Sequence, residues 1–136
     1  MILATAATLL ATVAPACQTH ACEVRTCDAS SCRERVARRR SRAEMRRYRR
    51  RQMPWCTWGP ESGAALPPFS VRRYRARNPA STAGGKFQVL DSTFHGVGGA
   101  DYPGTHDAAQ APPVVQERLA RRVLAVQGLR AWVGCR

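Results

Sequence analysis

Apolar residues recur at helical spacing in the C-terminal third of the chain, where one stripe is formed by Val115, Leu119, Val123 and Val126. Basic residues lie largely off this stripe, at Arg118, Arg121 and Arg122. Prolines at positions 112 and 113 precede the pattern, and Gly128 follows it. Proline is favoured at the first helical position and glycine just after the last one. The pattern therefore predicts an amphipathic helix from about residue 113 to Gly128.

A shorter pattern follows the glycine pair at positions 84 and 85, with Phe87, Leu90 and Phe94 spaced at i, i+3 and i+7. It predicts a helix from Lys86 to about Phe94, ended by the glycines at positions 96, 98 and 99. The chain has no repeats and little convincing strand pattern. We therefore expect a mainly α fold.

The first residues are apolar and small from Ile2 to Val13, and Ala14-Pro15-Ala16 then has the small-x-small form of a cleavage site. This predicts a signal peptide over residues 1–16 and a secreted or cell-wall-associated protein. A short buried helix is the alternative, and Cys17 directly after Ala16 also admits a lipid-anchored cysteine. The run is shorter than the roughly 20 residues that span a bilayer, so no transmembrane segment is expected.

Four cysteines then follow at a spacing of five, Cys17, Cys22, Cys27 and Cys32. In a short secreted chain they predict local disulfides, with the connectivity open. A four-cysteine zinc site is the alternative, but the spacing only partly fits the usual paired ligands. We expect disulfides here, no metal site and no cofactor.

Positive charge is concentrated in one segment of a chain with formal net charge +13, because 11 of its 22 basic residues lie between Arg33 and Arg51. We interpret residues 17–52 as a cysteine- and arginine-rich arm, partly disordered or helical, attached at Met53 to a domain over residues 53–136. Such an arm suits a polyanion, and in a secreted protein anionic cell-wall polymers or phospholipid headgroups are the candidates. Tyr48 is its only aromatic residue, so no specific nucleic-acid partner is expected.

Glu61 is an acid in an apolar setting, with Trp55, Trp58 and Pro60 close by and no basic residue from position 54 to position 70. Aromatic and apolar neighbours disfavour the charged form of a carboxyl, and a carboxyl that stays protonated can serve as a general acid. A surface or helix-end glutamate is the alternative. The Gly59-Pro60 pair disfavours a regular helix just before Glu61.

A set of short motifs follows Glu61 in order, namely Glu61-Ser62-Gly63, Asn78-Pro79, Gly84-Gly85-Lys86-Phe87-Gln88, Ser92-Thr93-Phe94 and a closing Gln127-Gly128 with Ala131-Trp132 and Cys135. Together they resemble the lysozyme-like catalytic domain of lytic transglycosylases, most closely the short version found in resuscitation-promoting factors of actinobacteria. The resemblance runs from Trp55 to Cys135, about 60% of the chain. It implies a small lysozyme-like domain.

The resemblance assigns Glu61 as the catalytic residue and places Gln88 and Thr93 beside the substrate cleft. Phe94 stands where the family usually has tryptophan, and Trp58 is a further candidate for sugar contact. The resemblance also pairs Cys135 with a cysteine near the glutamate. Pro60 occupies the position of that cysteine here, so Cys56 becomes the expected partner. Trp55 and Trp132 are sugar-stacking candidates as well, although a small domain needs some tryptophans in its core.

The implied activity is cleavage of the bond between N-acetylmuramic acid and N-acetylglucosamine in peptidoglycan glycan strands, with one glutamate as acid and then base. A hydrolytic lysozyme usually needs a second carboxylate, for which Asp91, Asp101 and Asp107 are the candidates. On the predicted helix Asp91 would lie three residues after Gln88 and on nearly the same side. The alternative function is a non-catalytic cationic cell-wall-binding protein on a degenerate lysozyme-like scaffold.

Overall fold

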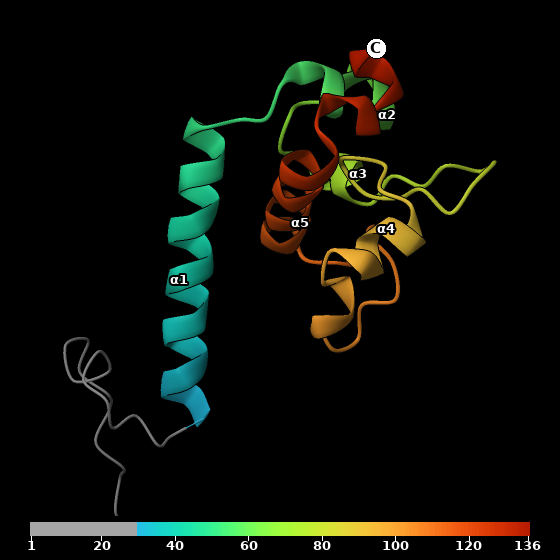
Figure 1. The fold of residues 1–136 in the computed structure, drawn as a ribbon. Helices are drawn as coiled ribbons and strands as arrows, with labels where there is room; N and C mark the ends of the chain where they lie inside the picture. Colours follow the sequence, from blue (N-terminus) through green and yellow to red (C-terminus); the bar gives the residue numbers. More distant parts are fainter. Residues whose placement is uncertain (1–29) are drawn as a thin grey trace, which may run out of the picture. The chain divides into compact units, whose positions relative to one another are not determined.

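The computed structural model describes residues 30–136, and this part of the chain is mainly helical (Figure 1), which confirms the predicted fold class. Its α-helices are α1 (Ser30–Arg50), α2 (Gly59–Ser62), α3 (Val71–Tyr74), α4 (Asp91–Gly96) and α5 (Pro113–Gln127). Its 3₁₀ helices are η1 (Trp55–Thr57), η2 (Gly99–Asp101), η3 (Leu129–Ala131) and η4 (Val133–Cys135). Over these residues β pairing is limited to isolated bridges, Arg77 with Gly84 and Gly84 with Val89. The predicted signal peptide and Cys17, Cys22 and Cys27 lie outside the described residues.

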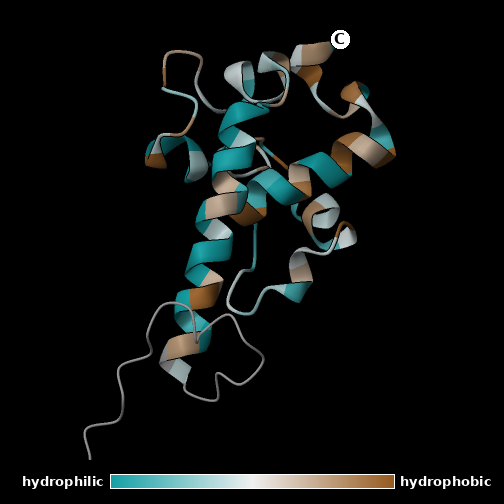
Figure 2. Cartoon of the chain, turned by 90° about the vertical axis from the view of Figure 1, so that its left-hand side faces the viewer, coloured by the Kyte–Doolittle hydropathy of each residue, from teal (hydrophilic) through white to brown (hydrophobic). Residues whose placement is uncertain are grey.

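Two compact units divide the chain, Met1–Arg39 and Arg40–Arg136, and α1 runs from the first into the second. Residues 30–50 contain no glycine or proline and are rich in good helix formers such as arginine, alanine and glutamate. Basic side chains in the last turn also favour the helix through its dipole. Figure 2 shows that most residues of this helix, which continues from the grey trace, are hydrophilic.

The second half of α1 packs against α5 through polar and aromatic groups. Arg118 donates from Nε to Glu44 Oε1 at 2.9 Å and from Nη2 to Glu44 Oε2 at 2.5 Å. The Arg121 guanidinium lies 4.1 Å from the centre of the Tyr48 ring, within reach of a cation–π interaction. The hydrogen bonds from Arg118 lower the pKa of Glu44. Attachment of this helix therefore depends on charge and geometry more than on apolar burial.

Helix α5 supplies much of the core, as its periodicity predicts. Val115, Leu119 and Val123 are buried, and Gly128 caps the helix with a positive φ of 68°. Val126, the last residue of the stripe, is 75% exposed. Its turn borders an open recess between α4 and α5, so the apolar stripe extends one turn beyond the core.

The predicted helix from Lys86 is wrong in its first half, because α4 begins only at Asp91. The residues before it form a tight turn, in which the Gly84 N–H donates to Val89 O at 3.1 Å and the Val89 N–H donates to Gly84 O at 3.0 Å. Gly85 and Gln88 have positive φ angles of 76° and 46°, which a right-handed helix cannot contain.

The core gathers residues from several separate segments of the second unit. Phe87 from the turn and Phe94 from α4 are each only 1% exposed, and they join the α5 side chains together with Met53, Trp58 and Trp132. In the part of the chain that the structure describes, no helix is both long and apolar enough to cross a membrane.

Candidate active site

Glu61 lies in the single turn of α2, and the expectation that Gly59-Pro60 disfavours a helix here is wrong. Pro60 stands in the first turn, where its missing N–H has no helical partner in any case. The Glu61 side chain is half-buried, and its Oε1 accepts a hydrogen bond from the Gly134 N–H at 3.1 Å. The carboxylate is thus partly open to solvent and tied to the C-terminal end of the chain.

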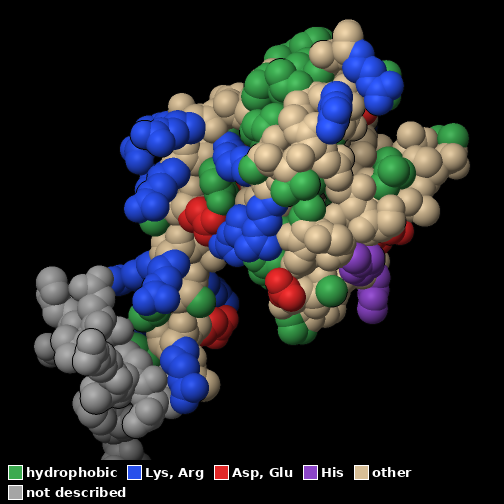
Figure 3. All heavy atoms as spheres, viewed as in Figure 1, with side chains coloured by type: hydrophobic (Ala, Val, Ile, Leu, Met, Phe, Trp, Pro, Cys, Tyr) green, Lys and Arg blue, Asp and Glu red, His purple; other side chains and the backbone are tan. Residues whose placement is uncertain are grey.

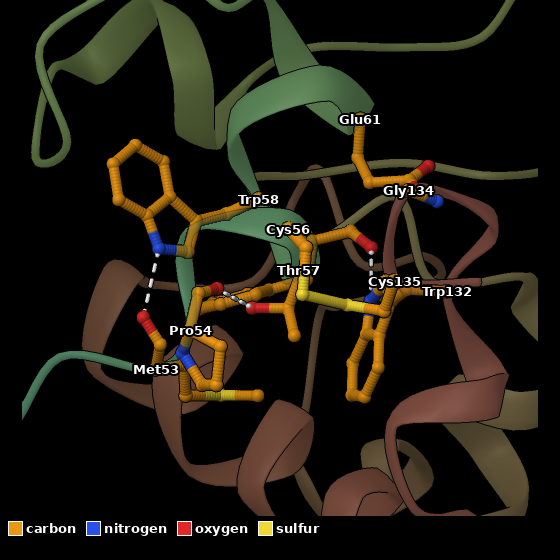
Figure 4. Close-up of a disulfide and its surroundings, with 10 residues drawn as sticks. Met53, Pro54, Cys56, Thr57, Trp58, Glu61, Trp132, Gly134 and Cys135 are labelled. Carbon is orange, nitrogen blue, oxygen red and sulfur yellow. Dashed lines mark hydrogen bonds between the residues drawn. A yellow bond between two sulfur atoms is a disulfide. The ribbon is translucent and has the colours of Figure 1, made fainter.

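A disulfide holds this C-terminal end beside Glu61. Cys56 in η1 and Cys135 in η4 are bonded across 79 residues of sequence, with their Cα atoms 5.0 Å apart (Figure 4). The bridge closes next to Gly134, whose N–H contacts Glu61. The register that the sequence left open, with Pro60 in place of the family cysteine, is thereby resolved in the structure.

Arg73, in α3, supports the turn that carries Glu61. Its side chain is fully buried, and no ion pair of the described residues includes it. Its guanidinium donates to the oxygens of Trp58 (2.7 Å), Gly59 (3.5 Å), Ser62 Oγ (2.9 Å), Gly63 (2.7 Å), Leu66 and Pro67 (3.2 Å). Burial lowers the pKa of Arg73, and the surrounding oxygens compensate a charge that would otherwise be costly to bury.

Ser62, the serine of the Glu-Ser-Gly motif, is part of the same support. Its Oγ accepts from Arg73 and donates to Trp58 O at 2.9 Å. Because Ser62 directly follows Glu61, these bonds fix the backbone that carries the carboxylate.

Gln88 lies in the Gly84–Val89 turn, with the positive φ noted above. Its Nε2 donates to Gly85 O at 2.9 Å and to Ala76 O at 3.3 Å, and the side chain is half-buried. A non-glycine residue in this conformation is uncommon and often marks a functional position. The amide N–H groups thus hold the turn, and any sugar contact would fall to the carbonyl oxygen.

Beneath the turn, Lys86 is buried with Glu117, and their Nζ and Oε1 atoms are 2.6 Å apart. Arg121 contacts Glu117 Oε2 at 2.7 Å and Tyr74 donates to Glu117 Oε1 at 2.9 Å. The Lys86 ammonium also lies 4.0 to 5.5 Å from the ring centres of Phe69, Phe87, Trp58 and Tyr74. Burial lowers the pKa of Lys86, with Glu117 opposing the shift, and burial raises the pKa of Tyr74. This network fastens the turn to α3 and α5.

Thr93 lies in α4 and borders the recess between α4 and α5, which has a volume of about 750 Å³. Arg122, Val126 and Gln127 line the opposite wall. Within residues 30–136 no hydrogen bond or ion pair joins Thr93 or Gln88 to Glu61. The three residues lie on separate elements.

Two residues expected to contact sugar are buried in the core. Trp58 is 6% exposed and donates from Nε1 to Met53 O at 3.1 Å, and Phe94 is 1% exposed. Figure 4 shows the side chains of Trp58 and Glu61 extending away from each other. Trp132 is also buried, whereas Trp55 is 55% exposed. The buried rings supply the large apolar groups that a small domain needs, and neither Trp58 nor Phe94 offers a free face for stacking.

The other candidate acids are engaged or placed elsewhere. Asp107 pairs with Arg77 at 2.8 Å, and Asp101 is exposed in η2. Asp91 begins α4, and its Oδ1 is buried without a hydrogen-bond partner among the described residues. Because Gln88 precedes the helix, the expected shared helical side of Gln88 and Asp91 does not exist. Over residues 30–136 no group of three histidine, cysteine or acidic side chains could hold a metal ion.

The sequence patterns did not predict the roles of Arg73, Gly134 and the Lys86 network. Arg73 is one arginine of a basic run, Gly134 is one glycine of ten, and Lys86 was expected on a helix. The one available signal was that Lys86 is the only lysine in the chain.

Residues 70–135 match the model of a family described as a transglycosylase-like domain. Probable transglycosylase SceD 2 of Staphylococcus saprophyticus is 45% identical over 58 residues, which are 43% of this chain and 23% of that protein. Probable transglycosylase SceD of Staphylococcus haemolyticus is 41% identical over 58 residues, 43% of this chain and 24% of that protein. The match thus spans about a quarter of these relatives. No solved structure matches the chain. The family match contains Gln88, Thr93 and Cys135 and begins after Glu61.

Proposed function

We propose that this protein cleaves peptidoglycan glycan strands, with Glu61 as the single acid and base, and the match of residues 70–135 to a transglycosylase-like family supports this proposal. The bond broken joins N-acetylmuramic acid to N-acetylglucosamine. The main observation that supports this proposal is the environment of Glu61. Its carboxylate is half-exposed, it is bonded to a backbone N–H, and its turn is fixed by Arg73 and by a disulfide.

The chemistry needs one carboxyl group. Protonated Glu61 gives its proton to the glycosidic oxygen as the bond to the muramyl C1 breaks through an oxocarbenium-like transition state. The Glu61 carboxylate then takes the proton of the muramyl 6-hydroxyl while that oxygen bonds to C1. The product is a 1,6-anhydro sugar, water is not consumed, and Glu61 ends in its starting state.

Rigid placement of the carboxyl supports this proposal. Holding a catalytic group in the reactive geometry accounts for a large part of many rate enhancements. Gln88 and Thr93 are proposed to contact substrate, Gln88 through its amide oxygen and Thr93 from the wall of the recess. Trp58 and Phe94 would then act only by supporting the core.

Mass spectrometry of the muropeptides released from purified peptidoglycan tests the proposal. The protein is compared with Glu61→Gln, which keeps the size of the side chain and removes the carboxyl, and with Asp101→Asn as a matched change at an exposed acid. Anhydromuramyl products that vanish only in Glu61→Gln support the proposal. Reducing-end products that also vanish in Asp91→Asn would point to a lysozyme, and wall binding without any products would favour the cationic binder.

We further propose that the arginines of α1 hold the protein on anionic cell-wall polymers. Figure 3 shows Lys and Arg side chains along this helix. Glu44, one of its two acids, forms its ion pair with Arg118 on α5. Arg47, Arg50 and Arg51 line a recess of about 380 Å³ at the end of the helix. A concentrated positive charge of this kind attracts polyanions in a salt-dependent way.

Binding to purified walls with and without their anionic polymers tests this second proposal. Replacing Arg47, Arg50 and Arg51 by glutamine should weaken retention at low salt. Replacing Arg72, Arg75 and Arg130, three exposed arginines outside α1, by glutamine removes the same charge and is the matched control. Equal losses in the two variants would mean that net charge alone, and no surface on α1, controls binding.

A further inference from the structure

We propose that Gly134 is a positioning residue for Glu61, whose backbone N–H holds Oε1 and leaves Oε2 as the oxygen that gives and takes the proton. The inference rests on the proposed function. Its starting point is the 3.1 Å hydrogen bond from Gly134 N to Glu61 Oε1.

The chemistry of the two groups distinguishes the two oxygens. A backbone N–H only donates, so the oxygen facing it must accept in every protonation state of Glu61. If Oε1 carried the proton, it would be a poorer acceptor for this N–H than it is as the carbonyl-type oxygen. The acid form that keeps this bond therefore carries its proton on Oε2. After transfer to the glycosidic oxygen, the same N–H remains bonded to the carboxylate, so no rearrangement is needed between the two steps.

Only glycine fits at position 134. A Cβ on this residue would lie 2.8 Å from the Cys56 carbonyl oxygen and 3.0 Å from Pro60 Cγ. The backbone of η4 is thus pressed against the two elements that lead to Glu61, η1 and α2. A side chain at this position would push the N–H away from the carboxylate.

The chain is anchored on both sides of this contact, at Cys135 and at Trp132. Cys135 is bonded to Cys56, and the Cys135 N–H donates to Trp132 O at 3.1 Å. Trp132 is buried and donates from Nε1 to Phe87 O at 3.0 Å. The position of the Gly134 N–H is therefore fixed by the buried Trp132 on one side and by the disulfide on the other.

The hydrogen bond is tested first, by NMR of the full chain and independently of activity. In Glu61→Ala the Gly134 amide loses its acceptor. Its proton resonance should move upfield and its exchange with solvent should accelerate, while the chemical shifts of the core amides remain unchanged. An unchanged Gly134 amide overturns the inference whether or not the protein is an enzyme.

Kinetics on soluble, uncrosslinked glycan strands test the role. Gly134→Ala should lower kcat on the order of ten- to a hundredfold, since a displacement of about 1 Å can cost that much, with little change in KM. Val133→Ala, a change at the exposed neighbour, should behave as the original protein. Circular dichroism checks that each variant is folded.

The outcomes separate the two proposals. A kcat loss in Gly134→Ala at unchanged KM and intact fold supports the inference. A kcat within about twofold of the original overturns it, as does a loss that only follows the unfolded fraction. If the original protein releases no Glu61-dependent product while the Gly134 amide responds to Glu61→Ala, the proposed function itself has failed, and the contact has no catalytic role.

Discussion

Arg73 offers the sharpest test of how the candidate site is held together. Three arginines lie within four residues of the basic segment, Arg72, Arg73 and Arg75, and only Arg73 is buried. Arg73→Met keeps an unbranched side chain as far as the position of Nε and removes all the side-chain donors. Arg72→Met and Arg75→Met change the net charge by the same amount at exposed positions.

The expected loss follows from what each acceptor would keep. Trp58 O still accepts from Ser62 Oγ and Gly63 O from the Leu66 N–H, whereas Leu66 O loses the only donor described for it. An orphaned buried carbonyl costs about 1–3 kcal/mol, and hydrogen bonds to a charged group contribute about 1.5–3 kcal/mol each without being additive. Methionine avoids the cost of burying a charge, which offsets part of the sum. We expect a loss of about 3 kcal/mol in the free energy of unfolding.

Thermal unfolding followed by circular dichroism measures this loss. For a unit of the size of residues 40–136, about 3 kcal/mol corresponds to a fall in Tm of about 12–24 °C. Arg72→Met and Arg75→Met should each shift Tm by no more than a few degrees, because surface changes usually cost about 0.5 kcal/mol or less. Arg73→Lys should lie between, since an ammonium has three donors and no planar fork. An Arg73→Met protein that melts with the two controls would refute the reasoning.

Three further predictions concern the rest of the support. Cys135→Ser opens a 79-residue disulfide loop and should cost about 4.5 kcal/mol in urea unfolding by the chain-entropy relation; a loss under about 1 kcal/mol would contradict this. Glu44→Gln should cost about 1 kcal/mol at pH 7, discounted because the Glu44–Arg118 pair is partly exposed. Arg118 lowers the pKa of Glu44 from 4.5, so the stability difference between the original protein and Glu44→Gln should stay constant above about pH 4.5. It should disappear as the pH falls through the pKa of Glu44 in the folded protein. A difference that persists at lower pH would argue against the pair. Glu117→Gln leaves the Lys86 cation buried without its carboxylate partner and should lower the free energy of unfolding by about 3–5 kcal/mol. The double variant Lys86→Met with Glu117→Leu removes both charges and should lose less stability. Equal losses in the two variants would rule out the charge pair as the cause.

Local pattern alone determined the clearest features of this protein. The period of α5, its prolines and Gly128 predicted a helix with the observed ends, because these signals act within a few residues of the backbone. The ordered motifs predicted the class of domain that the family match supports over residues 70–135. Their order also singled out Glu61 and Cys135 as candidates.

Tertiary structure decided what the local pattern could not. The local pattern predicts a helix at Lys86 and Gln88. In the structure the backbone of Gly84 pairs with that of Val89, and this pairing places both residues in a turn. Trp58 and Trp55 are alike in sequence, yet one fills the core and the other is exposed.

Arg73 differs from its neighbours only through acceptors up to 15 residues away, and Gly134 gains its role from a carboxylate 73 residues away. Periodicity carries information about one face of one element. Hydrogen bonds and ion pairs between distant segments depend on how those elements pack together. The sequence by itself therefore named the candidate acid, and only the folded chain determined which residues hold it in place.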